Sequence, residues 1–156
     1  VLIGGPQLMQ GYLNDPERTA KAIREIDGER WYVTGDQGRL DEVGFLTIVD
    51  RYSRFAKIGG EMVSLTAVEG IAGAVWPERR HAVVSIPDSR KGEKLVLVTD
   101  HASAEVAPLA EWARTNGAPE LVIPKKIVKV AEVPVLGTGK TDYVAIQKMV
   151  EAEKAA

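Results

Sequence analysis

A glycine-containing loop with a single lysine is the segment of this sequence best suited to chemistry on a charged group. Residues 135–141 read VLGTGKT, and Lys140 is the lysine. The segment almost matches the phosphate-binding pattern G-x-x-x-x-G-K-T, but Pro134 stands where the pattern requires glycine, and proline has no backbone N–H to offer a phosphate. One ammonium group on a mobile loop suits transient neutralisation of a phosphoryl or carboxylate group in a transition state. The alternative is a solvated surface lysine.

An aspartate beside a glycine follows the segment WYVT. Asp36 comes directly after Gly35, at the expected end of a strand. A carboxylate in that position can accept two hydrogen bonds from neighbouring hydroxyl groups, such as those of a ribose. The alternative is an ordinary turn aspartate.

Cations and paired glycines occur together in residues 51–61, which read RYSRFAKIGGE. Gly59 and Gly60 would let a ligand approach the backbone closely, and the clustered Arg and Lys side chains suit a phosphate-bearing partner. The same residues could equally form only a linker and a turn.

Several kinds of catalytic and metal site are excluded or disfavoured. The 156 residues contain no cysteine, which excludes disulfides, thiolate metal sites and a cysteine nucleophile within them. His81 and His101 lack the spacing of metal ligands and have no adjacent carboxylate cluster, so no metal site is predicted from the protein side chains. Neither histidine begins an H-x-x-x-x-D motif, and no G-x-S-x-G segment occurs.

The composition is that of a globular protein, with 45% hydrophobic and 27% charged residues. A net charge of -2 argues against a nucleic-acid partner. No apolar run approaches the roughly 18 residues that span a bilayer, and residues 1–6 lack the pattern of a signal peptide. Because the chain begins at Val1 with a strand-like apolar run and no Met, we expect a fragment of a longer protein.

The first third of the chain is predicted to be rich in strands. Asp15 followed by Pro16 predicts the start of a short helix that ends at about Arg24. Strands are expected at 31–34 and at 44–49, where apolar and β-branched residues follow turn signals.

The remainder is predicted to be a small α+β module. Thr66 and Glu69 match a capping box that begins a helix to about Val75, and Ser103 is expected to cap a helix that ends at Gly117. Further strands are expected at 81–86, 94–99 and 127–130, and a terminal helix at 143–153. The pattern of residue types and the sign of the net charge both change near Arg51. We therefore place a domain boundary there, between residues 1–50 and 51–156.

Taken in order, four segments resemble the closing third of the adenylate-forming acyl-activating enzymes. These segments are GYLNDPERT, WYVTGDQGRLDEVGFLTIVDR, FAKIGGEMVS and PVLGTGKTDY, and together they cover nearly the whole chain. Within that superfamily, RFAKIGGEMVSL, GAPELVIPKKI and VPVLGTGKTDY look most like the acyl-carrier-protein (ACP) synthetase part of the bifunctional 2-acylglycerophosphoethanolamine acyltransferases.

The resemblance implies a fold and a reaction. Residues 1–50 would be the β-rich tail of a large domain that binds ATP and a fatty acid, and residues 51–156 a small C-terminal domain that rotates over it in two poses. The fatty acid carboxylate would attack the α-phosphate of Mg-ATP, and a phosphopantetheine thiol, on acyl carrier protein or coenzyme A, would then take the acyl group. Lysophospholipid reacylation at the cytoplasmic face of the bacterial inner membrane would follow, through regions absent from this sequence.

The resemblance also implies roles for individual residues. Asp36 would bind the ribose hydroxyls with help from Arg51, and Lys140 would reach the reacting carboxylate and α-phosphate during adenylation. The segment 57–61, with Lys57, Gly59, Gly60 and Glu61, would replace Lys140 in the thioester-forming pose and let the pantetheine arm pass. Ser53 stands at the pivot, where the family usually has Asp or Lys. A hinge must absorb a change of backbone dihedrals, which serine can do.

Two alternatives remain at this point. The chain could be the C-terminal domain of an acyl- or aryl-CoA ligase, or a non-catalytic protein-binding module that derives from such an enzyme. The family's ATP-binding loop, adenine-stacking segment and magnesium-binding glutamate are not present in these residues. We therefore expect the chain alone to have no adenylation activity and no bound cofactor.

Overall fold

The computed structural model describes residues 1–155, and it divides them into two compact units, Val1–Ser53 and residues 54–155. The division falls three residues beyond the boundary expected at residue 50. The elements of the first unit are β1 (Leu2–Gly4), α1 (Pro16–Ala22), β2 (Ile23–Ile26), β3 (Glu29–Val33), β4 (Asp36–Leu40) and β5 (Leu46–Arg51). Those after them are η1 (Tyr52–Arg54), β6 (Phe55–Ile58), β7 (Glu61–Ser64), α2 (Leu65–Val75), β8 (His81–Asp88), β9 (Gly92–Thr99), α3 (Val106–Thr115), η2 (Glu120–Val122), β10 (Lys126–Lys129) and α4 (Tyr143–Ala155).

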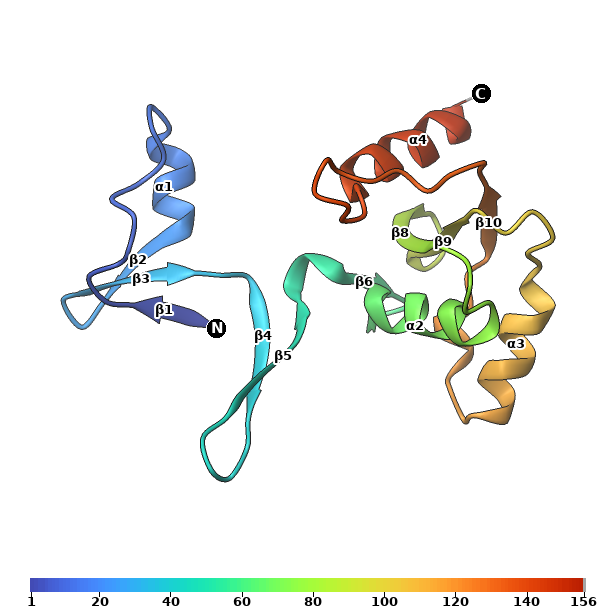
Figure 1. Cartoon of the computed structure of the whole chain (residues 1–156), viewed down its shortest axis with the longest axis horizontal. Coiled ribbons are helices and arrows are strands. Elements are labelled where there is room, and N and C mark those ends of the chain that lie inside the picture. The colour runs from blue at the N-terminus through green and yellow to red at the C-terminus, as the bar shows by residue number, and fades with distance from the viewer. Residues whose placement is uncertain (156) are drawn as a thin grey trace. The chain divides into compact units, whose positions relative to one another are not determined.

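The first unit consists of two small antiparallel sheets. One has the strand order β1-β3-β2, and the other is the β4–β5 hairpin, in blue to cyan in Figure 1. As predicted, the Asp15 carboxylate caps α1 by accepting from the backbone N–H of Arg18, and Pro16 occupies the first turn. The helix ends at Ala22 rather than near Arg24, because Ile23 is already extended and pairs with Tyr32 of β3.

The second unit is built around a five-stranded sheet with helices on both faces. Its order is β10-β9-β6-β7, and β8 pairs antiparallel with β9 along its full length. Helices α2 and α3 pack on one face with Val83, Leu95 and Leu97, and α4 packs on the other face with Val84 and Val96. Figure 1 shows the sheet between these helices. Alternate residues of β8 and β9 therefore face two separate apolar clusters, which explains their nearly continuous β-branched runs.

The α+β architecture predicted from the sequence is confirmed. Two predicted caps are wrong. The N-cap of α2 is Ser64, whose hydroxyl accepts from the N–H of Ala67 at 3.0 Å, because β7 runs directly into the helix. Ser103 lies before α3, whose N-cap position is Glu105, because a turn between His101 and the buried Ala104 occupies those residues. Within residues 1–155, every helix is too short or too polar to cross a lipid bilayer.

Candidate functional site

Asp36 and Arg51, the pair predicted to contact a ribose, lie opposite each other on the β4–β5 hairpin. The Nε of Arg51 donates to Oδ1 of Asp36 at 2.7 Å. The Asp36 side chain is 20% exposed and that of Arg51 is 67% exposed. Asp36 begins a strand instead of lying within a turn, and its backbone N–H donates to the Thr34 hydroxyl. The structure therefore presents a carboxylate and a guanidinium together on one hairpin.

Ser53, the predicted pivot, lies in η1, a 3-10 helix of three residues, and is the last residue of the first unit. Short 3-10 turns are common as connectors between elements. The turn contains no buried residue, so a change of its dihedrals would not disrupt the apolar core.

Gly59 and Gly60 form the two-residue turn of the β6–β7 hairpin, in which Ile58 pairs with Glu61. Their φ angles are 61° and 93°, as a type I′ turn requires, so hairpin geometry alone accounts for both glycines. The N–H of Gly59 donates to the carbonyl of Lys91 at 2.8 Å, which holds the turn against the β8–β9 connection. Lys57 and Glu61 lie in the same hairpin with exposed side chains.

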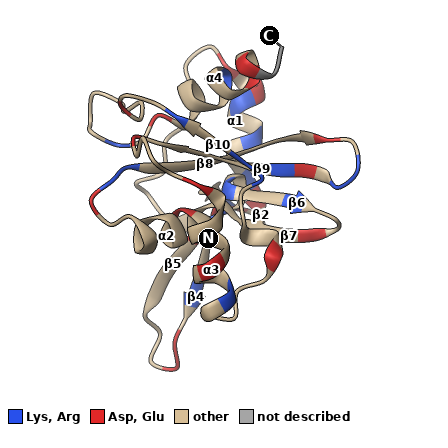
Figure 2. Cartoon of the chain, turned by 90° about the vertical axis from the view of Figure 1, so that its right-hand side faces the viewer, with Lys and Arg blue, Asp and Glu red and all other residues tan. Residues whose placement is uncertain are grey.

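A cavity of about 460 Å³, which sequence reasoning did not find, lies beside this turn. Apolar lining comes from Ile58, Leu95, Leu121 and Ile123, and basic lining from Arg90, Lys91, Lys94 and Lys125. The acidic lining residues are Asp88, Glu93 and Glu120. Charged residues of both signs mark the turn between β8 and β9 in Figure 2. No sequence pattern indicated this cavity, because its residues come from three separate segments, at residue 58, 88–95 and 120–125.

The acidic residues of the cavity are engaged within the protein. Asp88 accepts hydrogen bonds from the backbone N–H groups of Arg90 and Lys91, which hold the pKa of its carboxyl below the usual range. The ion pair with Lys125 at 3.0 Å likewise lowers the pKa of Glu120. Four basic and three acidic residues line the cavity, which leaves a formal surplus of one positive charge.

Lys140 is exposed at the end of a loop that backbone hydrogen bonds close. The carbonyl of Lys140 accepts from the N–H of Leu136 at 2.7 Å, and Gly139 donates to the carbonyl of Leu136 at 2.8 Å. Val135 and Thr141 form an isolated antiparallel bridge across the base of the loop. Among the residues that the structure describes, none forms an ion pair with the Lys140 ammonium. The amine is therefore available to a ligand.

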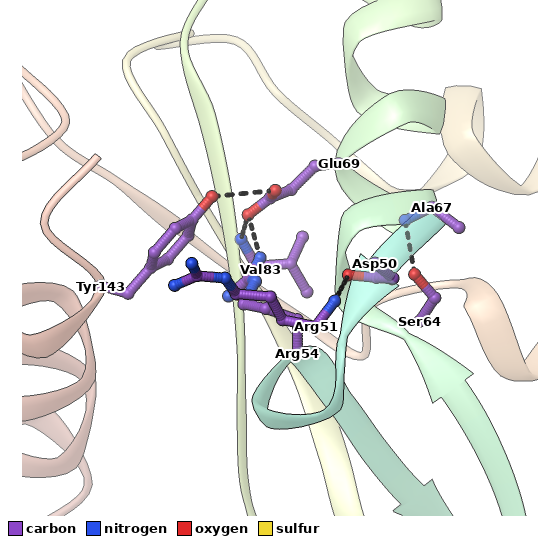
Figure 3. Close-up of polar contacts among 8 residues, drawn as sticks. All are labelled: Asp50, Arg51, Arg54, Ser64, Ala67, Glu69, Val83 and Tyr143. Carbon is purple, nitrogen blue, oxygen red and sulfur yellow. Dashed lines mark hydrogen bonds and ion pairs between the residues drawn. The ribbon is translucent and has the colours of Figure 1, made fainter. Parts of the chain in front are cut away.

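A polar cluster that sequence reasoning missed joins three elements of the second unit. Arg54 of η1, Glu69 of α2 and Tyr143 of α4 meet beside Val83 of β8 (Figure 3). The sequence offered only indirect signals for it: Glu69 was assigned to a capping box and Tyr143 marked the start of a helix. Because 74 positions separate Glu69 from Tyr143, no local pattern could reveal their contact.

The structure thus brings the predicted residues together in three groups. Asp36 and Arg51 form a pair, residues 57–61 form one hairpin turn, and Lys140 stands on its own loop. In the described part of the chain, no three His, Asp or Glu side chains lie close enough together to hold a metal ion.

The chain is similar in sequence to known acyl-activating enzymes. It is 36% identical over 141 residues to a 2-succinylbenzoate–CoA ligase of Listeria innocua, covering 90% of this chain and 29% of that protein. It is also 36% identical over 143 residues to a long-chain-fatty-acid–CoA ligase of Bacillus subtilis, covering 90% of this chain and 25% of that protein. The chain therefore spans under a third of the length of these relatives. No protein-family model matches it.

A solved structure gives the same result for the fold. The ATP-bound crystal structure of MatB from Rhodopseudomonas palustris superposes with a TM-score of 0.77 at 25% identity, covering 94% of this chain and 29% of that one. The homologues of this chain are acyl-CoA ligases and related adenylate-forming enzymes, and the chain matches their C-terminal region.

Proposed function

We propose that this chain is the C-terminal part of an ATP-dependent enzyme that activates a carboxylic acid and passes it to a thiol. The premise is that its homologues are adenylate-forming ligases. In the first step, a carboxylate oxygen attacks the α-phosphorus of Mg-ATP, and the bond to the bridging oxygen breaks to release pyrophosphate. In the second step, the thiol sulfur attacks the acyl carbon, the thiol proton is lost, and AMP leaves with the electrons of the acyl–oxygen bond.

The observation that carries this proposal is the exposed ammonium of Lys140 on a hydrogen-bonded loop. Developing negative charge on the carboxylate and α-phosphate oxygens needs a cation that is present during adenylation and can withdraw afterwards. A lysine held in its own module, beyond the 3-10 turn that contains Ser53, meets both needs, since rotation at that turn carries the whole module. Asp36 would accept the ribose hydroxyl hydrogen bonds, and Arg51 would hold its carboxylate in place.

The second pose would use the β6–β7 hairpin turn. The Gly59–Gly60 turn allows close approach of a narrow pantetheine arm because neither residue has a side chain, and the space that a Cβ would occupy is open beyond the adjoining residues of the chain. The cavity beside the turn combines an apolar surface with a surplus of basic side chains, which suits the phosphate end of the same arm. Lys57 and Glu61 flank the turn.

The acceptor has two candidate forms. The segments RFAKIGGEMVSL and GAPELVIPKKI favour a carrier protein, and with it a fatty acid delivered to a lysophospholipid at the cytoplasmic face of a membrane. The similarity to two CoA ligases favours coenzyme A. The full-length protein supplied with each acceptor, both carrying the same phosphopantetheine thiol, decides between them by which becomes acylated. The chain alone should show no fatty-acid-dependent ATP–pyrophosphate exchange.

The decisive variant is Lys140→Ala in the full-length protein. One preorganised charge-stabilising donor is worth about 2.7–4 kcal/mol, so adenylation should fall about 10²- to 10³-fold. Thioester formation from preformed acyl-adenylate should be spared, because the proposed role ends before that step. The matched control is Lys148→Ala, which removes an exposed lysine from α4. Retention of both half-reactions in Lys140→Ala would instead support a non-catalytic binding module.

A further inference from the structure

The cluster of Arg54, Glu69 and Tyr143 uses every hydrogen-bonding atom of one carboxylate. Oε1 of Glu69 accepts from Nη2 of Arg54 at 2.6 Å and from the backbone N–H of Val83 at 2.7 Å. Oε2 accepts from the hydroxyl of Tyr143 at 3.1 Å, and Nη1 of Arg54 donates to the carbonyl of Val83 at 3.0 Å. The Arg54 guanidinium also lies over the Tyr143 ring, 3.7 Å from its centroid (Figure 3). Each member therefore contacts both others.

The cluster is largely shielded from water, with the side chains of Arg54 and Glu69 12% and 15% exposed. Burial, and secondarily the negative charge of Glu69, raise the pKa of the Tyr143 hydroxyl, so the phenol stays protonated and remains a donor. A shielded ion pair of this kind contributes little net stability compared with an apolar replacement. Here the hydrogen bonds to both oxygens of the Glu69 carboxylate restrict its orientation. The cluster is therefore better suited to holding its three side chains in one arrangement than to stabilising the fold.

Its position in the chain connects two functional elements. Arg54 directly follows Ser53, the proposed pivot, and Tyr143 begins α4 three residues after Lys140. Short backbone links lead from Tyr143 to the lysine: Asp142 donates to the carbonyl of Pro134, Thr141 pairs with Val135, and Lys140 accepts from Leu136. The cluster thus ties the residue after the pivot to the base of the lysine loop.

We propose that Arg54, Glu69 and Tyr143 are positioning residues that fix the lysine loop to the pivot end of the module, so that rotation at Ser53 delivers the Lys140 ammonium to one place. This proposal rests on the function proposed above. It assigns the three side chains no contact with substrate. Without the cluster the module still rotates, but the loop is no longer held to the segment that rotates it.

The test variant is Tyr143→Phe in the full-length protein, because it removes one hydroxyl and keeps the ring over Arg54. We expect kcat of adenylation to fall, with KM for ATP unchanged and thioester formation from preformed adenylate unaffected. A misplacement of about 1 Å costs up to about 10²-fold, so the fall should lie below that limit. The matched control is Gln147→Ala, which removes a different side-chain contact between α4 and the Ser85 carbonyl of β8. It should leave both half-reactions unchanged.

A double variant separates positioning from general stability. With Lys140→Ala already present, Tyr143→Phe should cause no further loss of adenylation, because the group that it positions is gone. An equal loss with and without Lys140, or an equal loss in both half-reactions, would overturn the positioning role while leaving the role of Lys140 intact. If Lys140→Ala has no effect on adenylation, the proposed function itself fails, and the positioning role with it.

A second measurement needs no activity. In the present chain, amide hydrogen exchange at Leu136 and Gly139 reports the two bonds that close the lysine loop. Tyr143→Phe and Glu69→Gln should both speed this exchange, and Gln147→Ala should not. Unchanged exchange in both cluster variants would contradict the proposal even if the full-length enzyme lost activity for another reason.

Discussion

The two units differ most in where their apolar side chains lie. None of the residues in Val1–Ser53 is buried, and large apolar side chains of the β4–β5 hairpin are open to solvent, among them Val43 at 79% and Phe45 at 72% exposure. The second unit contains the entire buried core, in two clusters on opposite faces of its sheet. The Asp36–Arg51 pair thus lies on a unit without a core, and Lys140 on one with its own.

This difference matches what the proposed function requires of each group. An ammonium that arrives and withdraws must be carried by a module that keeps its shape in both poses, which requires a core of its own. A carboxylate that accepts from a ribose needs only a fixed place on a hairpin, and the Arg51 guanidinium provides part of that fixation. The energetics of the two units should therefore respond very differently to the same kind of substitution.

The largest expected effect is on stability. Leu97→Ala removes a fully buried side chain between α2 and the sheet and should destabilise the second unit by about 2–5 kcal/mol. Ile48→Ala in β5, where the side chain is 52% exposed, should change stability by no more than about 0.5 kcal/mol. Similar losses in both variants would break the contrast between the units.

Tryptophan fluorescence can follow the two units separately during denaturant unfolding. Trp31 reports on the first unit, and Trp76 and Trp112 report on the second. A Trp31→Phe background isolates the second unit. There, Leu97→Ala should shift the transition to lower denaturant concentration and Ile48→Ala should leave it in place.

The elements of the second unit could largely be predicted because strands that are buried on both faces have nearly continuous apolar runs in the sequence. The runs 81–86 and 94–99 lie within β8 and β9, and the helix expected between Ser103 and Gly117 contains α3. Caps were harder, since Ser64 and Thr66 are both suitable and only the end of β7 decides between them. Strand β4 was missed because Gln37, Gly38 and Arg39 carry no strand pattern.

Some contacts of the candidate site could likewise be predicted from the sequence, and others could not. Neighbours across a hairpin can be anticipated from motifs, as with Asp36 and Arg51. The contacts of Glu69 with Arg54 and Tyr143 depend on how α2, α4 and β8 pack, and packing leaves no signal in local sequence. Glu69 even fits a local role, as the acid of a capping box that begins at Thr66, but the N-cap is Ser64 and Glu69 pairs with Arg54 instead.

Asp36→Asn should have a smaller effect than Leu97→Ala, and the effect should be on ATP binding instead of stability. This substitution keeps the shape of the side chain and removes its charge. Hydrogen bonds to a charged group are worth about 1.5–3 kcal/mol, so KM for ATP in the full-length enzyme should rise at least about tenfold. Thermal stability should hardly change, because exposed ion pairs contribute about 0–1 kcal/mol. Asp27→Asn, in the β2–β3 turn, is the control. An unchanged KM would remove Asp36 from the nucleotide site.

The smallest expected effect that distinguishes the exposed first unit from the buried core of the second is the titration of two tyrosines with raised pKa values. In the first unit the pKa of Tyr32 is raised chiefly by its hydrogen bond with Tyr12, whereas in the second unit the pKa of Tyr143 is raised chiefly by burial. Tyr12→Phe should therefore return Tyr32 towards the ordinary value near 10. Glu69→Gln should lower the pKa of Tyr143 only in part, since burial remains.

Phenolate absorbance measures both shifts: that of Tyr143 in a variant that keeps it as the only tyrosine, and that of Tyr32 by comparing variants with and without Tyr12. A raised pKa in the folded state means that Tyr143 contributes stability below about pH 10 that is lost as the pH rises through the folded value. For each protein, the free energy of unfolding at alkaline pH is compared with its own value at neutral pH. On that scale, the second unit should lose stability at lower pH in wild type than in Tyr143→Phe, which has no phenol to ionise at position 143. If Glu69→Gln returned Tyr143 fully to the ordinary value, the charge of Glu69 and not burial would dominate, and the cluster would be more open to water than its exposed fractions indicate.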